Sequence, residues 1–267
     1  MCTPTSKPLH DYLDYYESQC PIYDIYRSDI LDCLQDRLHH ILRIGSIDSS
    51  SHILDIGCGT GRYSLTLSDL TGCKIVGLDI HKSMLSQAKK KDKKASILWC
   101  GGDGTVLPFC NEVFDLILII YVIHQVNHPF LLFKEAYRTL KFGGRLIICT
   151  SSYQQLSSFI LYRACPQLLW RELSRFPSIQ DINRIALENG FEKENEIVED
   201  FPRNFIPKKF FFEMIKNRFL SILSSLSKQE IEMIIGKVDK LLGKDGTEQI
   251  RTYGYTILCY RKVNFRT

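Results

Sequence analysis

A short apolar run that ends in a glycine-rich turn constrains this 267-residue chain more than any other feature. The run is residues 53–56 (ILDI), and the turn is residues 57–61 (GCGTG). A segment of helical pattern, residues 63–70, follows the turn directly. Glycine lets a backbone turn sharply and approach a ligand closely, so a strand, a glycine turn and a helix in succession are typical of ligand-binding α/β units. The pattern therefore predicts a ligand site at this turn.

Strand and helix patterns continue to alternate after the turn. Residues 116–120 are apolar throughout, as expected of a central parallel strand that is covered on both faces. Alternation of this kind implies parallel crossovers. We therefore expect an α/β fold: a Rossmann-like, mostly parallel sheet with helices on both faces. The further expected strands are 74–78, 96–99 and 145–150, and the helices are 82–90 and 130–140.

The alternation weakens after Thr150. We expect one or two helices over 157–173 and a helix over 178–189, with Ser178 as N-cap and Gly190 as C-cap. A strand over 191–198, helices over 210–226 and 228–242, and a closing strand over 252–260 follow. A tyrosine-rich helical pattern over 11–42 precedes the sheet. The predicted organisation is an amino-terminal helical cap, residues 1–50, and a ligand-binding domain, residues 51–267, with helical inserts at about 151–177 and 201–246.

Two details of the turn indicate its ligand. A dinucleotide-binding turn has a third glycine at the position of Arg62, and a P-loop would continue with Gly-Lys-Ser/Thr, which is absent from the sequence here. Asp55 lies two residues before the first glycine, where its charge would repel a pyrophosphate. The same carboxylate can pair with the ammonium group of an amino acid, directly or through water. The turn therefore favours a ligand with an amino-acid moiety.

Two more acidic residues follow the next two strands. Asp79 ends the second strand, where a carboxylate can accept hydrogen bonds from ribose hydroxyls; it can also cap the helix that begins near Lys82. Asp103 lies between Gly102 and Gly104, where it can meet an adenine amino group or simply close a turn. Each residue alone leaves both interpretations open. In register with the glycine turn, they form one pattern.

This pattern resembles that of the class I S-adenosylmethionine-dependent methyltransferases. The closest branch includes ubiquinone- and menaquinone-biosynthesis enzymes and many small-molecule methyltransferases. The resemblance covers residues 51–152 and also rests on residues 107–109 (LPF), 114–115 (FD) and 138–144 (RTLKFGG). It implies a seven-stranded sheet whose last strand is antiparallel, and S-adenosylmethionine as the cofactor.

The resemblance also implies a role for each matched residue. Asp55 and the turn would hold the methionine part of the cofactor, Asp79 the ribose hydroxyls and Asp103 the adenine amino group. Ile80 and Met84 would pack on the purine, and the glycine after Asp103 would allow close approach to it. The predicted cofactor-binding residues are Asp55, Gly57, Cys58, Gly59, Gly61, Asp79, Ile80, Met84, Asp103, Gly104 and Tyr121.

The acceptor is expected at the carboxyl ends of the strands, where ligands bind in open α/β sheets. The helical inserts emerge at that edge, so we expect them to form a lid that excludes water and orients the acceptor. His124 and Tyr121, just after the fourth strand, are the predicted catalytic residues; His124 would be the base if the acceptor must lose a proton, or it could bridge backbone groups. The phenylalanine-rich second insert is either helix core or an apolar pocket. The predicted pocket residues are Tyr15, Tyr16, Tyr23, Tyr26 and Gln125.

Composition argues against several other classes. Apolar residues make up 45% of the chain and charged residues 24%, and the net charge of +4 is small for a nucleic-acid binder. The longest apolar run, residues 116–123, falls far short of the ~20 residues of a membrane span, and no secretory signal pattern is present. The ten cysteines contain no CxxC pair, which argues against a disulfide framework or a zinc site. We expect a cytoplasmic enzyme with a small-molecule acceptor and no metal, nucleic-acid or membrane partner.

Three alternatives share the cofactor motifs. An RNA or protein methyltransferase is one, although base-methylating enzymes carry Asn/Asp-Pro-Pro-aromatic where residues 120–123 read IYVI. A second uses S-adenosylmethionine itself as the reactant, by cyclisation or aminocarboxypropyl chemistry, and releases methylthioadenosine. A third is a non-catalytic binding module, against which the intact acidic and glycine positions argue. Methyl transfer to a small molecule is the favoured interpretation.

Overall fold

The structure is a computed structural model that describes residues 10–27, 34–200, 205–243 and 249–264. The chain forms two compact units, each assembled from three segments. The sheet unit consists of Leu34–Thr150, Pro177–Val198 and Thr256–Thr267. The helical unit consists of Met1–Cys33, Ser151–Phe176 and Glu199–Tyr255. All the predicted cofactor-binding residues therefore belong to the sheet unit.

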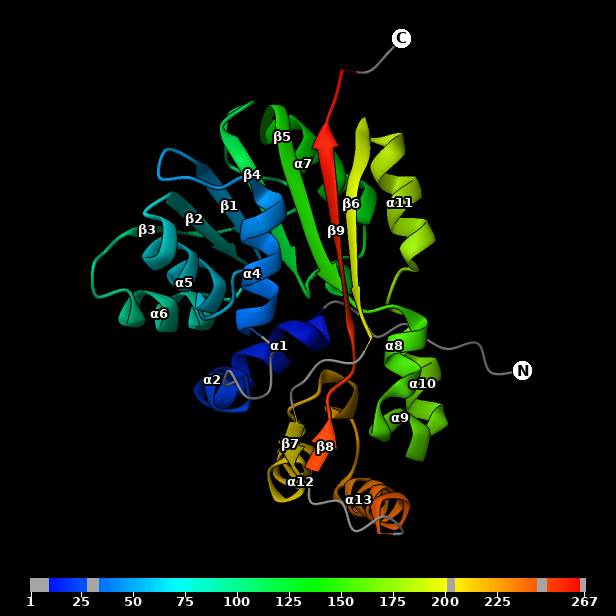
Figure 1. The fold of residues 1–267 in the computed structure, drawn as a ribbon. Coiled ribbons are helices and arrows are strands. Elements are labelled where there is room, and N and C mark those ends of the chain that lie inside the picture. The colour runs from blue at the N-terminus through cyan, green and yellow to red at the C-terminus, as the bar shows by residue number, and fades with distance from the viewer. Residues whose placement is uncertain (1–9, 28–33, 201–204, 244–248, 265–267) are drawn as a thin grey trace. The chain divides into compact units, whose positions relative to one another are not determined.

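The strands of the main sheet are β1 (His52–Ile56), β2 (Lys74–Asp79), β3 (Ile97–Gly101), β4 (Phe114–Ile120), β5 (Leu140–Thr150), β6 (Phe191–Glu199) and β9 (Tyr255–Lys262). They form one seven-stranded sheet in the order β3-β2-β1-β4-β5-β9-β6 (Figure 1). The pairs β1–β2, β1–β4, β2–β3 and β4–β5 are parallel, and β9 runs antiparallel to β5. The predicted seven-stranded, mostly parallel sheet with a reversed closing strand is confirmed.

The helices of the sheet unit are α4 (Leu34–Gly45), α5 (Arg62–Thr71), α6 (Lys82–Lys91), α7 (Pro129–Thr139) and α11 (Ile179–Glu188), with a short 3-10 helix, η2 (Ile123–Gln125). α4 and α5 pack together on one face of the sheet, and α7 and α11 pack together on the other (Figure 1). The side chains of β1 contact helices on both faces of the sheet, because successive side chains of a strand point to opposite sides. Leu54 and Ile56 share a buried cluster with Leu132 and Ala136 of α7, whereas Asp55 meets α5. The predicted helices on both faces of an α/β sheet are confirmed.

Strand register brings four strand ends to one edge of the sheet. Ile56 is aligned with Leu78 of β2 and with Ile119 of β4, and Asp79 is aligned with Gly101 of β3. All four strands are parallel, so these are carboxyl ends, where α/β sheets bind their ligands. The glycine turn and the segments that follow β2, β3 and β4 therefore leave the sheet beside one another.

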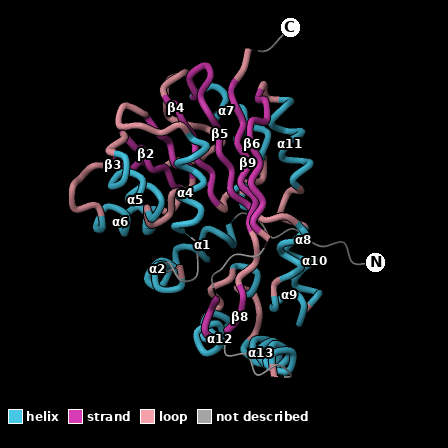
Figure 2. Tube along the Cα trace, viewed as in Figure 1, coloured by secondary structure: helices cyan, strands magenta, loops and turns pink. Residues whose placement is uncertain are grey.

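The helical unit is built mainly of short helices (Figure 2). A large part of its buried core is aromatic and aliphatic, with Leu161, Phe211, Leu223 and Val238 fully covered. None of the helices in the described ranges combines the length and the apolar character that crossing a membrane demands. The elements of the helical unit are α1 (His10–Gln19), η1 (Cys20–Ile22), α2 (Tyr23–Tyr26), α8 (Tyr153–Ser158), α9 (Ile160–Ala164), α10 (Pro166–Leu173), β7 (Phe205–Pro207), α12 (Lys208–Lys216), η3 (Ser221–Leu223), α13 (Lys228–Leu242) and β8 (Gln249–Arg251).

Helix ends in this unit differ from those predicted. The one or two helices expected over 157–173 are three, because Phe159 (φ −70°, ψ 135°) and Cys165 (φ −137°, ψ 74°) leave the helical region. Cys165 precedes Pro166, whose ring disfavours helical backbone in the residue before it. The helix expected over 210–226 ends at Lys216, and Arg218 closes it with a φ of 52°. The short β7–β8 pair was not predicted.

The predicted lid segments fall largely in the helical unit. Of the amino-terminal cap, residues 1–50, the part up to Cys33 belongs to this unit, whereas α4 belongs to the sheet unit. Residues 28–33 of the expected first helix, and 201–204 and 244–246 of the second insert, lie outside the described residues. That these segments cover the cofactor site stays a prediction.

Candidate active site

The turn between β1 and α5 holds its three glycines in the left-handed backbone region, with φ of 71° at Gly57, 55° at Gly59 and 77° at Gly61. Packing closes the first and third positions. A Cβ at Gly57 would lie 2.3 Å from Val122 Cγ2, and one at Gly61 would lie 2.4 Å from Trp99 Cη2. A Cβ at Gly59 would meet no atom of the described residues within 4 Å. The backbone is therefore open to a ligand at Gly59, as a close-approaching cofactor requires.

Asp55 is a buried carboxylate on β1, with 3% of its surface exposed. The Ser64 hydroxyl, in the first turn of α5, donates to Asp55 Oδ2 at 2.6 Å. Burial raises the pKa of Asp55 from 3.8 to about 6; the Ser64 hydrogen bond opposes this shift, and the charge of Asp79 adds to it. A carboxylate whose ionised form is disfavoured by burial gains most from a cationic partner. Asp55 therefore fits the ammonium group of an amino-acid ligand.

Asp79 ties the glycine turn to β2. Its Oδ2 accepts the Gly59 N–H at 2.7 Å, and its Oδ1 accepts the His81 N–H at 2.8 Å and lies 2.9 Å from His81 Nδ1. His81, and not Asp79, is the N-cap residue of α6. A carboxylate has about four acceptor positions, so these contacts leave about one for a ligand. Asp79 therefore holds Gly59, the glycine that is open to a ligand, and it also lies at the carboxyl edge of the sheet.

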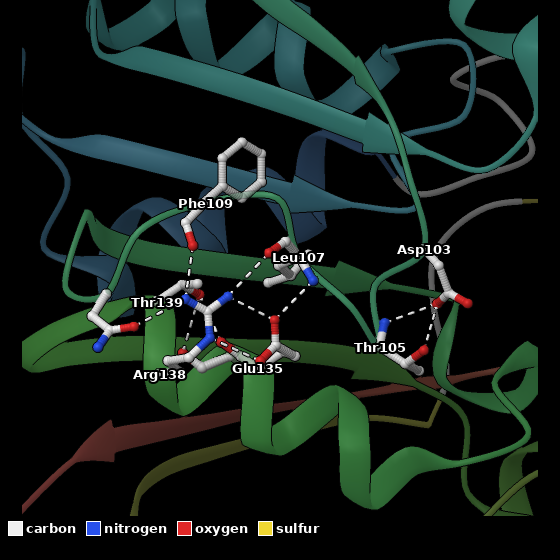
Figure 3. Close-up of polar contacts among 9 residues, drawn as sticks. Asp103, Thr105, Leu107, Phe109, Glu135, Arg138 and Thr139 are labelled. Carbon is white, nitrogen blue, oxygen red and sulfur yellow. Dashed lines mark hydrogen bonds and ion pairs between the residues drawn. The ribbon is translucent and has the colours of Figure 1, made fainter.

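Asp103 closes a turn after β3. Its Oδ1 accepts the backbone N–H and the hydroxyl of Thr105, each at 2.8 Å (Figure 3). The carboxylate is exposed and can also meet a ligand. Gly104 has a packing role: a Cβ there would lie 2.8 Å from Ile56 Cγ2 and 3.0 Å from Leu132 Cδ1. The glycine lets this loop lie against β1 and α7.

A network from α7 holds the loop that carries Asp103, and sequence reasoning did not single it out. Arg138 bonds Glu135 and donates to the carbonyl oxygens of Leu107 (3.0 Å) and Phe109 (2.7 Å) (Figure 3). Glu135 accepts the Leu107 N–H at 2.8 Å. This pair of charged residues anchors irregular backbone that no strand supports. The sequence signal was Arg138 at the start of the RTLKFGG motif, with Glu135 three residues earlier on the same helix; the contacts of this pair with Leu107 and Phe109 are not evident from spacing.

The segment after β4 carries Tyr121, His124 and Gln125, all half-buried. Tyr121 has a φ of 56°, which is uncommon for a residue with a side chain and marks strain that is often found at functional sites. Its N–H donates to Cys149 O at 2.9 Å, and Gln125 Nε2 donates to Tyr121 O at 3.2 Å. His124 lies within η2. The structure therefore gathers these predicted residues in one turn, where Gln125 supports the backbone of Tyr121.

Three further predicted cofactor residues lie beside the turn and β2. Ile80 is 45% exposed and presents an apolar surface at the sheet edge, whereas Met84 of α6 is buried at 2%. The Cys58 N–H donates to Leu78 O at 3.0 Å. Burial raises the pKa of the Cys58 thiol, so this sulfur is held as a neutral group within the turn.

Arg37 of α4 is a buried cation at this edge that sequence reasoning missed. Its Nη1 donates to Tyr63 Oη and its Nη2 to Tyr121 Oη, each at 3.1 Å. A signal was present: Arg37 lies on the apolar stripe of α4 between Leu34 and Ile41, where the spacing predicts a buried side chain. A charged residue in such a position needs a partner within the fold.

The four predicted pocket tyrosines come together in the helical unit. Tyr15 Oη donates to Phe219 O, and the Tyr15 and Tyr16 rings lie 4.9 Å apart. Tyr26 Oη accepts from Asn217 Nδ2 at 2.7 Å. Tyr23 and Tyr26 both contact the Phe219 ring, at 5.8 and 4.9 Å between ring centroids. Their place in an acceptor pocket stays a prediction.

Comparison with known proteins relates part of the chain to methyltransferases. Residues 54–148 match the family model described as "Methyltransferase domain". The chain is 32% identical, over 165 residues, to demethylmenaquinone methyltransferase of Lactococcus lactis subsp. lactis (strain IL1403). That match spans 60% of this chain and 63% of the relative, which is less than two thirds of the relative's length.

Solved structures share the fold at low identity. Phosphoethanolamine N-methyltransferase 2 of Haemonchus contortus, in complex with S-adenosyl-L-methionine, has a TM-score of 0.64 and 19% identity, covering 98% of this chain and 62% of that one. The YcgJ protein of Bacillus subtilis has a TM-score of 0.61 and 16% identity, covering 86% of this chain and 99% of that one. The comparisons thus show a methyltransferase domain over residues 54–148 and a fold shared with a solved methyltransferase that binds S-adenosyl-L-methionine.

Proposed function

We propose that this protein transfers the methyl group of S-adenosylmethionine to a small-molecule acceptor. One observation carries the proposal: the buried carboxylates of Asp55 and Asp79 flank a glycine turn that is open at Gly59. When bound, the cofactor supplies a methyl group that its sulfonium already activates. The residues of the chain then need to bind and orient the reactants and to exclude water.

The acidic and apolar side chains of the site fit this cofactor. Asp55 would hold the ammonium group, Asp79 the ribose and Asp103 the adenine amino group, while Ile80 offers apolar surface to the purine. Because three donors of the chain already contact the Asp79 carboxylate, it can take one ribose hydroxyl directly. A second hydroxyl would have to replace one of these donors, of which the His81 ring is the one that can rotate away.

A small organic acceptor is supported by the relatives named demethylmenaquinone methyltransferase. His124 and Tyr121 follow β4 at the carboxyl edge, where an acceptor would meet the methyl group. His124 would take the proton of an acceptor that must lose one, and Tyr121 would contact the cofactor or the acceptor.

The test is product analysis with methyl-labelled cofactor and a cell extract that contains metabolites, RNA and protein. We expect S-adenosylhomocysteine to accumulate and the label to enter a compound of low mass, and we expect Asp79→Asn to abolish both signals. Release of methylthioadenosine would overturn the proposal in favour of chemistry on the cofactor itself. Label in RNA or in protein would overturn the small-molecule acceptor.

A further inference from the structure

The helical unit contains a pocket of about 520 Å³ between α1 and the segment that follows α12. Tyr15 of α1 lines the pocket, and its hydroxyl donates to Phe219 O, so the two walls are bonded to each other. Pockets of this volume hold small organic molecules. Every residue that lines this pocket belongs to the helical unit, whereas the predicted cofactor-binding residues belong to the sheet unit. The two sets of residues are therefore distinct.

The end of α12 places an arginine at this pocket in an unfavourable backbone conformation. Arg218 has a φ of 52°, in the left-handed region. Its N–H donates to Ile215 O at 3.0 Å, and the Phe219 N–H donates to Met214 O at 2.9 Å, which is the Schellman pattern of a helix end. Glycine or asparagine adopts this conformation more readily than arginine. Backbone strain of this kind is found mostly at binding and active sites.

The guanidinium of Arg218 is held in place and keeps hydrogen-bonding capacity. Its Nε donates to Leu226 O at 3.0 Å, which fixes the plane of the group. Nη1 and Nη2 donate to no acceptor among the residues that the structure describes. The side chain is half-buried and lines the pocket, so the N–H groups of both terminal nitrogens are available to a ligand. Such a guanidinium binds a carboxylate or a phosphate group through paired hydrogen bonds.

Two neutral acceptors belong to residues that line the same pocket. Gln19 Oε1 is buried and accepts no hydrogen bond from any described residue. An unpaired buried acceptor destabilises the protein, and a donor from a ligand would remove that penalty. Asn217 gives its amide hydrogens to Tyr26 Oη at 2.7 Å and to Glu213 O at 2.9 Å, so its Oδ1 remains as an acceptor. The pocket thus combines a cationic donor with acceptors for hydroxyl or amino groups.

We propose that this pocket binds a small organic anion that also carries hydroxyl or amino groups. The carboxylate or phosphate of the ligand pairs with Arg218, and its hydroxyl or amino groups donate to Gln19 Oε1 and Asn217 Oδ1. Asp14, the other charged residue that lines the pocket, disfavours a ligand with a second anionic group. The site is separate from the cofactor site of the proposed function and does not depend on it.

The test uses probes that separate the two kinds of group. Glycerol 3-phosphate and glycerate combine an anionic group with hydroxyls, glycerol has the hydroxyls alone, and inorganic phosphate and acetate have the anionic group alone. In NMR titrations of the wild-type protein we expect one of the first two probes to bind with a dissociation constant of about 1 mM or less. That probe should bind at least about 10-fold more tightly than glycerol and than its own bare anion. The better of the two identifies the anionic group. Equal binding of glycerol, equal binding of the bare anion, or no binding of either hydroxylated anion would each overturn the proposal.

Two variants assign the binding to the pocket. Arg218→Asn removes the cation and keeps a residue that tolerates left-handed backbone, so the protein should stay folded while the better probe binds at least about 10-fold more weakly. Gln19→Leu removes the buried acceptor, so it should weaken that probe about 3- to 10-fold and leave the affinity for the bare anion within about 2-fold. Arg163→Gln is the control, because Arg163 is an exposed arginine of α9 that does not line the pocket. An unchanged affinity in Arg218→Asn, or an equal loss in Arg163→Gln, would contradict the site.

Discussion

At the scale of single residues, burial of the ionised Asp55 carboxylate in the candidate site lowers the stability of the folded protein. Its carboxylate is buried beside a second carboxylate, that of Asp79, and its pKa is raised to about 6. The unfolded chain would hold this group near 3.8, so the folded protein binds the additional proton more readily. Stability from this residue therefore falls as the pH rises from about 4 to 6, and above that range the whole cost is present. Only a cationic ligand offsets it.

Asp55→Asn should stabilise the free protein and weaken ligand binding. A pKa shift of about two units corresponds to about 3 kcal/mol, so the gain at pH 8 has roughly that upper limit. Affinity for S-adenosylhomocysteine should fall roughly 100-fold, because a charge-assisted contact is lost. Urea denaturation and calorimetry measure the two effects. Asp115→Asn is a control with the opposite expected effect on stability. Lys141 and the His52 N–H lower the pKa of Asp115, so removing the charge of this carboxylate should destabilise the protein.

The same carboxylate should make cofactor binding depend on pH. Between pH 5 and 7 the amino group of the ligand stays protonated, so Asp55 dominates the change that we expect. Affinity should be constant above about pH 6 and fall up to 10-fold per unit below it, as Asp55 becomes protonated. Calorimetry across this range, with Asp55→Asn alongside, provides the measurement. A slope that persists in the variant would assign the titration to another group.

His124→Ala should separate catalysis from binding. If His124 is the base, turnover should fall 100- to 10,000-fold while the cofactor dissociation constant changes less than about 3-fold. Gln125→Ala is the neighbouring control; it removes a hydrogen bond to Tyr121 O and should disturb binding at least as much as turnover. Steady-state kinetics and calorimetry on both variants decide the question. Parallel losses of turnover and affinity in His124→Ala would remove the base assignment.

At the scale of elements, the glycine turn separates packing from ligand approach. Gly57→Ala would meet Val122 and carry a left-handed φ, so we expect a loss of about 2–5 kcal/mol of stability. Gly59→Ala has open space, so it should cost only about 1–2 kcal/mol for its backbone. Its main effect should be a 10-fold or greater loss of cofactor affinity.

A double-mutant cycle checks the origin of the first effect. Val122→Ala removes the atoms that a side chain at position 57 would meet, so it should restore part of the stability lost in Gly57→Ala. Urea denaturation of the two single variants and the double variant gives the coupling. If the two losses simply add, Val122 is not the cause. An unchanged cofactor affinity in Gly59→Ala would place the ligand away from this turn.

The elements that the sequence predicts well are those with a strong apolar period and a familiar end. Ser178 caps α11 as predicted, with its hydroxyl accepting the Asp181 N–H at 3.0 Å. The end of α12 was not predicted because the residue with left-handed backbone that ends it is Arg218, whereas glycine or asparagine is the usual signal for such an end. Arg37 was missed in the site for a related reason. Its partners Tyr63 and Tyr121 lie far away in sequence, and only the fold brings them together.

At the scale of the whole molecule, neither unit is a continuous piece of chain. The sheet unit needs Thr256–Thr267 to place β9 between β5 and β6, and the chain reaches that segment only after passing through the helical unit. The helical unit, in turn, gathers three segments; Ser151 follows β5 directly, and Glu199 and Tyr255 are end residues of β6 and β9. Loss of the sheet would release those ends and add loop-closure entropy to the helical unit. The topology therefore favours unfolding of both units in one step.

Hydrogen exchange with and without S-adenosylhomocysteine tests this coupling. All the predicted cofactor residues lie in the sheet unit, so a ligand that binds there stabilises that unit directly. At a free concentration of 100 times the dissociation constant, mass action slows exchange through global unfolding by about 100-fold. If the units unfold together, the slowest amides of α9 and α13 should slow by the same factor as those of β4 and β5, because they exchange through the same opening. If the helical unit opens by itself, its amides will exchange at the same rate with and without the ligand, and the single-step account of unfolding is wrong.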